Sequence, residues 1–219
     1  MFGSSAKTRH KIEHPPRWLI TCALVLTYIL TVLPLRLLYR ARRSFLAEIR
    51  SLERGSLIIA NHQSMVDPFV ITMNLPFLAY LKLVPIYFPV TSEYMRKPIV
   101  GFLMRLLGCY DVGISKQEKM QAFFHTRKLI QQGQTVFLFP EGKISHNNIK
   151  EFERGIEFFF KEAKRVMFVK ISGFNRVDWV RPWKIECSIV YGEAEESRGS
   201  ALPVSTLRNH LAGMTEMQA

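Results

Sequence analysis

Cysteine is scarce in this 219-residue chain, and its spacing argues against two kinds of covalent or metal stabilisation. The three cysteines, Cys22, Cys109 and Cys187, are odd in number and far apart, and no CxxC pair or Cys/His cluster occurs. A disulfide framework or a structural zinc site needs such groupings. We therefore expect a chain held by its hydrophobic core, with a reduced, cytosol-facing location as the simplest interpretation.

Acidic residues are also in short supply. Eighteen Asp and Glu stand against 30 Lys and Arg, which gives a formal net charge of +12. Such a charge calls for a polyanionic partner or an anionic surface, and nucleic acid and a membrane are the two candidates. Hydrophobic residues make up 48% of the chain, enough for a sizeable core, which excludes a disordered or fibrous protein. The length predicts one domain with a modest extension.

The longest uncharged run is WLITCALVLTYILTVLPL, from Trp18 to Leu35. As a helix it would be about 27 Å long, at the limit for crossing a hydrocarbon core of roughly 30 Å. Basic residues flank the run on both sides, so the positive-inside rule gives no orientation. This pattern suits a helix that dips into a membrane and returns, or lies in the interface. A secretory signal peptide and a buried soluble helix are the alternatives.

Residues 35–50 continue with an imperfect apolar stripe among arginines. The stripe is typical of an interfacial amphipathic helix drawn to anionic lipid, although a packed helix with a solvated face is the alternative. We therefore predict that residues 1–52 form a membrane-attached helical pair. Arginines mixed with leucine-rich segments do not resemble a base-reading surface, so anionic membrane lipids, and no nucleic acid, are the expected partners.

From Ser56 onward, short apolar runs alternate with amphipathic helices, which predicts an α/β domain over residues 53–219. We expect a mixed, largely parallel sheet flanked by helices. Ser115 and Glu118 form a capping box, which predicts that a helix begins after Ser115. Gly133 predicts where that helix ends. A second helix is predicted from the apolar spacing between Phe152 and Ala163. The expected strands are Leu57–Ala60, Pro85–Val90, Cys109–Val112, Thr135–Phe139, Val166–Ile171 and Lys184–Tyr191.

A first polar constellation, NHQSMVDP, directly follows the expected strand Leu57–Ala60. Strand ends are where α/β folds place reactive groups. The carboxylate of Asp67 could accept the imidazole N–H of His62 and fix its tautomer, which leaves the other ring nitrogen as a general base. In the alternative, Asp67 caps a helix that begins at Pro68, and His62 is incidental. The remaining histidines, His14 and His125 among them, have no partner at a telling spacing and are predicted to lie on the surface.

A second constellation, FPEGKIS, follows the expected strand Thr135–Phe139. It would share an edge of the sheet with His62 if the two strands are parallel. Gly142 lets backbone N–H groups approach a ligand closely, and Glu141 beside Lys143 could hold a polar head group. The alternative is an ordinary strand-to-loop turn with a surface acid. We find no convincing set of metal ligands.

NHQSMVD and FPEG resemble the two signature blocks of the glycerolipid acyltransferase family, typified by 1-acylglycerol-3-phosphate acyltransferase. The segment from Pro98 to Gly101 and the FxRG block ending at Gly155 resemble two further blocks of that family. The resemblance implies that His62 and Asp67 form a catalytic dyad and that Glu141 and Gly142 belong to acceptor binding. It also implies membrane association and an acyl thioester donor. Because thiolate is a good leaving group, we expect no metal or cofactor. The further substrate-binding candidates are Asn61, Ser64, Lys116 and Lys143.

Three stretches depart from the family pattern, and in one of them Lys170 stands where proline is usual. Ile114 stands where the family places an arginine, and Ile144 follows Lys143 where many members have Thr-Arg. Both family arginines are associated with the phosphate of the acceptor. Lys116 and Lys143 could supply charge there, as point charges without the bidentate fork of arginine.

The expected function is that of a membrane-bound O-acyltransferase at the cytoplasmic face of the (inner) membrane. It would move a fatty acyl group from acyl-CoA or acyl carrier protein to a lysophospholipid, foremost 1-acylglycerol-3-phosphate, giving phosphatidic acid. A different acceptor, such as a remodelled lysophospholipid or a lyso-aminolipid, is the first alternative. A non-catalytic membrane lipid-binding protein with the same fold is the second.

Overall fold

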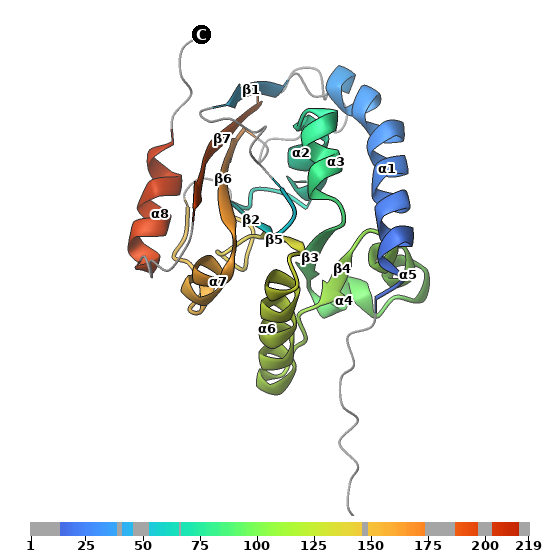
Figure 1. Cartoon of the computed structure of the whole chain (residues 1–219), viewed down its shortest axis with the longest axis vertical. Coiled ribbons are helices and arrows are strands. Elements are labelled where there is room, and N and C mark those ends of the chain that lie inside the picture. The colour runs from blue at the N-terminus through green and yellow to red at the C-terminus, as the bar shows by residue number, and fades with distance from the viewer. Residues whose placement is uncertain are drawn as a thin grey trace, which may run out of the picture.

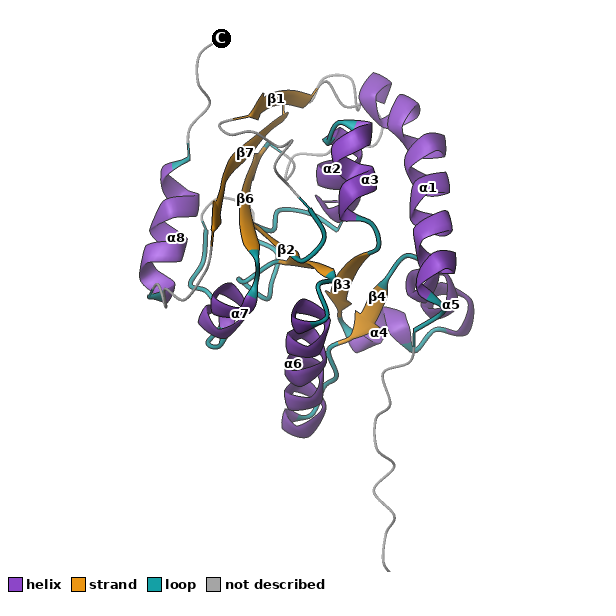
Figure 2. Ribbon diagram, viewed as in Figure 1, coloured by secondary structure: helices purple, strands orange, loops and turns teal. Residues whose placement is uncertain are grey.

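A computed structural model describes residues 14–38, 41–45, 53–65, 67–145, 149–173, 187–196 and 203–214. Within these ranges a seven-stranded sheet is flanked by helices (Figures 1 and 2). The strands are β1 (Ala41–Phe45), β2 (Ser56–Ala60), β3 (Ile86–Val90), β4 (Cys109–Asp111), β5 (Thr135–Leu138), β6 (Arg165–Ser172) and β7 (Cys187–Glu196). The helices are α1 (Arg17–Leu38), α2 (Asp67–Asn74), α3 (Phe77–Leu83), α4 (Ser92–Met95), α5 (Pro98–Leu106), α6 (Lys116–Gln131), α7 (Ile156–Glu162) and α8 (Val204–Gly213).

The sheet has the order β1-β7-β6-β2-β5-β3-β4. Five adjacent strands are parallel to one another: β6, β2, β5, β3 and β4. Strand β7 runs antiparallel to β6, and β1 pairs with β7 in parallel. The predicted mixed, largely parallel sheet is therefore confirmed. All of β2 is buried, which explains why its sequence SLIIA lacks polar alternation. The carboxyl ends of the five parallel strands meet at one edge.

Helices cover both faces of the sheet. The connections from β2 to β3 and from β3 to β4 step in one direction along the sheet, and those from β4 to β5 and from β5 to β6 step back. Because such crossovers are right-handed, α2 to α5 lie on one face and α6 and α7 on the other. Helix α1 packs on α2 and α5 along one side of the molecule (Figure 1).

The local signals for α6 and α7 can be compared with their observed ends. The Ser115 hydroxyl accepts the Glu118 N–H at 3.2 Å, and the Glu118 carboxylate accepts the Ser115 N–H at 2.8 Å, so the capping box is confirmed. Helix α7 begins at Ile156, later than the spacing from Phe152 predicts. Gly155, with φ +102°, takes a left-handed conformation that breaks the helix there.

The expected second N-terminal helix is wrong. Residues 41–45 form β1, in register from Ala41 opposite Cys187 to Phe45 opposite Tyr191. Pairing with β7 satisfies backbone groups of both strands, a gain that an apolar stripe does not reveal. The first helix is confirmed as α1, whose buried face includes Ile20 and Leu24. Among the helices in the described ranges, none has the length and hydropathy to cross a bilayer. Residues 46–52 lie outside the description, and the position of a domain boundary stays a prediction.

His14 and His125 are not surface residues as predicted, because they meet between α1 and α6. Their Nε2 atoms lie 2.9 Å apart, and their rings stack with centroids separated by 5.0 Å. The His14 ring also meets the edge of Tyr87 on β3, at 5.1 Å between centroids. The next turn adds a bond from the Arg17 guanidinium to the Gln132 side chain at 2.9 Å. These contacts fasten the start of α1 to the sheet.

This histidine pair predicts a loss of stability in mild acid. Burial, aided by the nearby His125 and Arg105, lowers the pKa of His14 from 6.5 to about 4, and burial lowers the pKa of His125 as well. The unfolded chain then binds more protons between pH 6.5 and 4, so the free energy of unfolding falls as the pH drops through that window. Urea unfolding at several pH values should show that the free energy of unfolding depends less steeply on pH in His14→Gln than in the wild type. Identical slopes for both proteins would contradict the assignment.

Candidate active site

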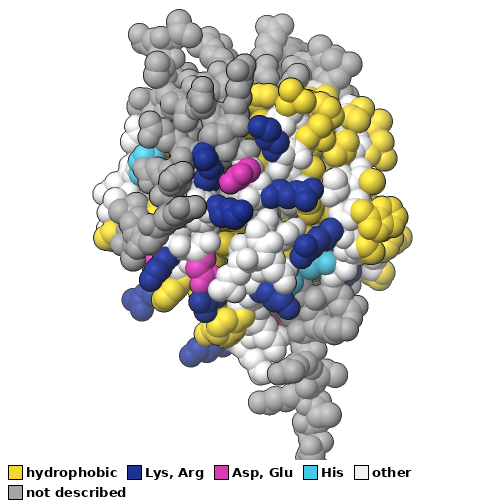
Figure 3. Space-filling view, viewed as in Figure 1, with side chains coloured by type: hydrophobic (Ala, Val, Ile, Leu, Met, Phe, Trp, Pro, Cys, Tyr) yellow, Lys and Arg dark blue, Asp and Glu magenta, His cyan; other side chains and the backbone are white. Residues whose placement is uncertain are grey.

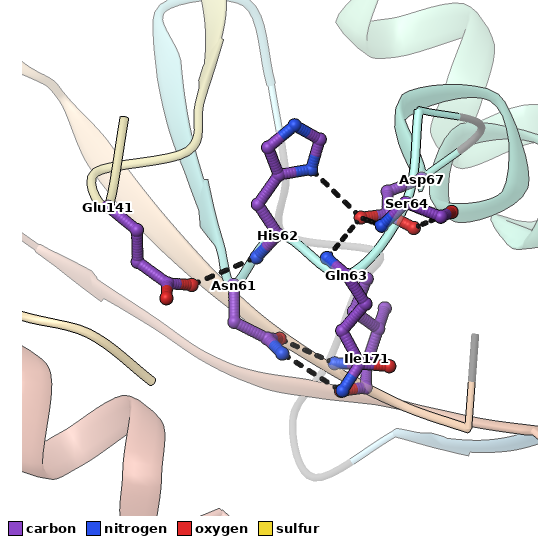
Figure 4. Close-up of polar contacts among 7 residues, drawn as sticks. All are labelled: Asn61, His62, Gln63, Ser64, Asp67, Glu141 and Ile171. Carbon is purple, nitrogen blue, oxygen red and sulfur yellow. Dashed lines mark hydrogen bonds and ion pairs between the residues drawn. The ribbon is translucent and has the colours of Figure 1, made fainter. Parts of the chain in front are cut away.

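The polar loop after β2 begins with a side chain that is fixed within the protein. Asn61 donates from Nδ2 to the Ile171 carbonyl at 2.9 Å and accepts the Ile171 N–H at 2.7 Å (Figure 4). The amide is buried and ties the end of β2 to β6. Because both of its polar groups are used this way, the predicted contact of Asn61 with substrate finds no support in this arrangement.

The structure brings His62 and Asp67 together. Their Nδ1 and Oδ2 atoms lie 2.9 Å apart, and the carboxylate is fully buried. Asp67 Oδ2 also accepts the N–H groups of Gln63 and Ser64, at 2.6 and 2.7 Å, while the Ser64 hydroxyl donates to Oδ1 at 2.5 Å. Four donors thus hold one carboxylate in a fixed position, and Ser64 contacts Asp67 where a substrate contact was predicted.

The helix-capping alternative for Asp67 differs from what is observed. Asp67 is the first residue of α2, and its carboxylate bonds backward to the preceding loop. A capping side chain would instead accept N–H groups further along the helix. The loop is therefore folded around this carboxylate.

The imidazole of His62 is oriented on two sides. Because a carboxylate can only accept, Nδ1 carries a proton, and in the neutral imidazole the lone pair is therefore on Nε2. The ring stacks on Phe139 with centroids 4.1 Å apart and planes 20° from parallel. No described residue bonds Nε2, which points away from Asp67 in Figure 4, and the side chain is 19% exposed. This nitrogen is free to take a proton from a ligand.

The turn after β5 is attached to the main chain of His62. Glu141 accepts the His62 N–H at 2.9 Å through Oε1 and the Lys150 N–H at 2.7 Å through Oε2. The His62 carbonyl in turn accepts the Ser145 N–H at 2.7 Å. Since β2 and β5 are parallel neighbours, the two constellations share one edge of the sheet.

The candidates in this turn differ in accessibility. Glu141 is only 4% exposed and has both oxygens engaged, so the structure assigns it to holding two loops together instead of a head group. Gly142, with φ +64°, and Lys143 are exposed on the same turn. They form the accessible rim next to the histidine.

Lys116 is not brought to the dyad. It opens α6 after β4, and β5 and β3 lie between β4 and β2 in the sheet. Its side chain is exposed, and it takes part in none of the hydrogen bonds described for this site. In the described part of the chain, no three His, Cys, Asp or Glu side chains cluster so that they could hold a metal ion.

The sequence did not predict the roles of three residues of the site. Phe139 supports the imidazole ring, Ser145 bonds the His62 carbonyl, and the Ile171 backbone holds Asn61. Phe139 and Ser145 lie within the second motif, but nothing in the motif says which way they face. Ile171 lies 110 positions from its partner, and no local pattern could have signalled that contact.

The fold and this site define an α/β enzyme with an imidazole–carboxylate pair at the carboxyl edge of a largely parallel sheet. Residues 40–172, more than half of the chain, match the model of the Acyltransferase family. The chain belongs to that family and is an acyltransferase, as the two motifs suggested.

A solved structure supports the same fold. The 1-acyl-sn-glycerophosphate (LPA) acyltransferase PlsC from Thermotoga maritima is similar to this chain with a TM-score of 0.58 and 17% sequence identity. The similarity covers 87% of this chain and 74% of PlsC. At this identity the likeness establishes the shared architecture.

The contacts of Glu141 make a testable prediction. In Glu141→Gln, the side chain offers one acceptor where two N–H groups need one each, so an NH₂ group faces a backbone donor. We expect the free energy of unfolding to fall by about 2 kcal/mol and the turnover of acyl transfer to fall about 10²-fold as His62 shifts. Thermal unfolding and steady-state kinetics would measure these changes.

Glu153→Gln is the matched control, because Glu153 is exposed on the segment facing Gly142. It should leave both quantities unchanged. A raised KM for the acceptor, with normal stability and turnover in Glu141→Gln, would instead indicate direct substrate binding.

Proposed function

We propose that this protein is a membrane-bound O-acyltransferase that acylates the free hydroxyl of a lysophospholipid, foremost 1-acylglycerol-3-phosphate. The observation that carries the proposal is the unbonded Nε2 of His62, backed by the buried Asp67. Membership of the Acyltransferase family supports the reaction class. The similarity to an LPA acyltransferase supports a glycerophospholipid acceptor.

The reaction proceeds by general-base catalysis. Nε2 of His62 removes the proton of the acceptor hydroxyl while that oxygen attacks the thioester carbonyl. The new C–O bond forms, the C–S bond then breaks, and the proton held by the imidazolium leaves with the thiolate as a free thiol. Asp67 stabilises the imidazolium while it exists. No enzyme nucleophile is needed, because the substrate's own oxygen attacks.

Two exposed positions bear on which acceptor this proposal favours. Lys143 lies beside Gly142 on the turn attached to His62, where its ammonium can meet a phosphate as a point charge. Ile114, at 65% exposure, offers no charge at a position where the family has arginine. This observation favours a second candidate, a remodelling enzyme whose acceptor is a lysophospholipid with a larger head group.

The donor in this proposal is an acyl thioester, acyl-CoA or acyl carrier protein. Both are anionic, and the net charge of +12 would concentrate them near the protein. The proposed location is the cytoplasmic face of the membrane, where acceptor and product reside.

An acceptor panel tests the proposal. Purified protein and labelled palmitoyl-CoA or palmitoylated carrier protein are combined with lysophosphatidic acid, lysophosphatidylethanolamine, lysophosphatidylcholine or a lyso-aminolipid, and the lipid products are separated. Phosphatidic acid as the main product supports the first acceptor, and another diacyl product supports the second candidate. Lipid binding without any transfer by either donor would show a non-catalytic protein.

A further inference from the structure

Three helices from separate parts of the chain expose apolar side chains on the same side of the molecule. Figure 3 shows these side chains gathered along the side where Figure 1 places α1 and α5. Helix α1 packs on α5, and the ring of Tyr28 on α1 lies 5.4 Å from that of Phe77 on α3. The most exposed apolar residues of this set are Trp18, Leu26, Leu30, Leu78, Ile99 and Phe102.

The charged residues of these three helices have one sign. As the structure bounds them, α1, α3 and α5 contain no Asp or Glu. Their basic residues include the exposed Lys82, and Arg17 and Arg105, whose guanidinium groups bond Gln132 and the Met95 carbonyl. A protein partner would bring mixed charges, whereas an apolar face with only positive charge complements an anionic bilayer, in which acyl chains lie beneath phosphate groups.

Tyr94 and Lys97 connect the start of α5 with the loop that contains His62 and Asp67. Met65, 57% exposed, lies between His62 and Asp67 in that loop. The Tyr94 hydroxyl on α4 donates to the Met65 sulfur at 3.4 Å, and the Lys97 ammonium lies 5.5 Å from the centre of the Tyr94 ring. The next residue begins α5. A lipid at the exposed start of α5 is therefore close to the loop that holds the base.

We propose that α1, α3 and α5 together form a docking face for an anionic lipid bilayer, with the start of α5 as the place where lipid passes toward His62. This differs from attachment through the N-terminal segment alone, because α3 and α5 belong to the α/β part of the chain. The inference rests on the proposed function only in that the substrates are bilayer lipids.

The decisive experiment compares two double variants. Ile99→Gln with Phe102→Gln removes apolar side chains that are 76% and 57% exposed on α5, and the matched control, Phe124→Gln with Phe158→Gln, removes residues that are 54% and 57% exposed on α6 and α7. Sedimentation with vesicles containing phosphatidylglycerol measures the partition coefficient. The α5 variant should bind about tenfold or more weakly, and the control should bind like the wild type. Equal loss in both variants, or in neither, would overturn the proposal.

A second measurement does not depend on the folding of these variants. Trp18 is 66% exposed on α1, so brominated lipids in anionic vesicles should quench part of the tryptophan emission, and Trp18→Phe should remove that part. The absence of this difference would also count against the docking face. Transfer to a lysophospholipid in detergent micelles should persist in the control variant, Phe124→Gln with Phe158→Gln. A failure of micellar transfer in the wild type would instead bear on the proposed function.

Discussion

Replacing His62 by alanine should lower the turnover of acyl transfer about 10³-fold, within the range that general-base catalysis contributes. The variant loses the ring nitrogen Nε2, which no described residue bonds and which points away from Asp67. Residual transfer would come from binding donor and acceptor side by side. Release of free thiol from palmitoyl-CoA, measured with a saturating lysophospholipid, gives the rate directly.

The fold of this variant should survive, because the imidazole makes one side-chain hydrogen bond and the Glu141 contact uses the His62 backbone. His210→Ala, on the exposed surface of α8, is the control and should keep full activity. If His62→Ala retained more than a tenth of the wild-type turnover, the imidazole would not be the base.

Asp67→Asn should have the second largest effect, a fall of about 10³-fold in turnover with little change in KM. The amide oxygen can keep the donors that meet at Oδ2, and the NH₂ group can bond the Ser64 hydroxyl, so the loop retains its shape. What is lost is the negative charge that stabilises the imidazolium as it forms. Alanine at this position would be less informative, because it leaves buried donors without a partner.

Asp111→Asn is the matched comparison for this change. Asp111 is a buried carboxylate at the end of β4 that bonds Ser92 and the Gly113 N–H, and β4 is separated from β2 by two strands. Both variants should lose a similar free energy of unfolding, about 1–2 kcal/mol. Only Asp67→Asn should lose turnover, and a parallel loss of activity in both would point to general destabilisation.

Much of the fold could be predicted because its signals are local. The apolar run of β2 and the capping box at Ser115 each fit within a few residues. The errors have distant causes: β1 exists because residues 41–45 meet β7, which joins the sheet only late in the chain. Periodicity within one segment cannot report such a pairing, so the arginine-rich segment seemed helical.

In the candidate site, too, some contacts could be predicted from local sequence and others could not. The pairing of His62 and Asp67 could be predicted from their spacing, because a loop of five positions brings the two side chains into contact. The task of Glu141 does not follow from its motif, since one N–H group it accepts belongs to His62 in the loop after β2 and the other to Lys150, nine residues further along its own connection. Whether Lys116 could reach the base depended on strand order, which no motif specifies.

The central position of β2 has a consequence for how this enzyme could change its substrates. The main chain at His62 is anchored from both neighbouring strands, through Asn61 to β6 and through Glu141 from the turn after β5. Lys143, by contrast, is solvent-accessible and bears none of that anchoring. Under the proposed function, substitutions at Lys143 should therefore change head-group preference while His62 and Asp67 keep their positions.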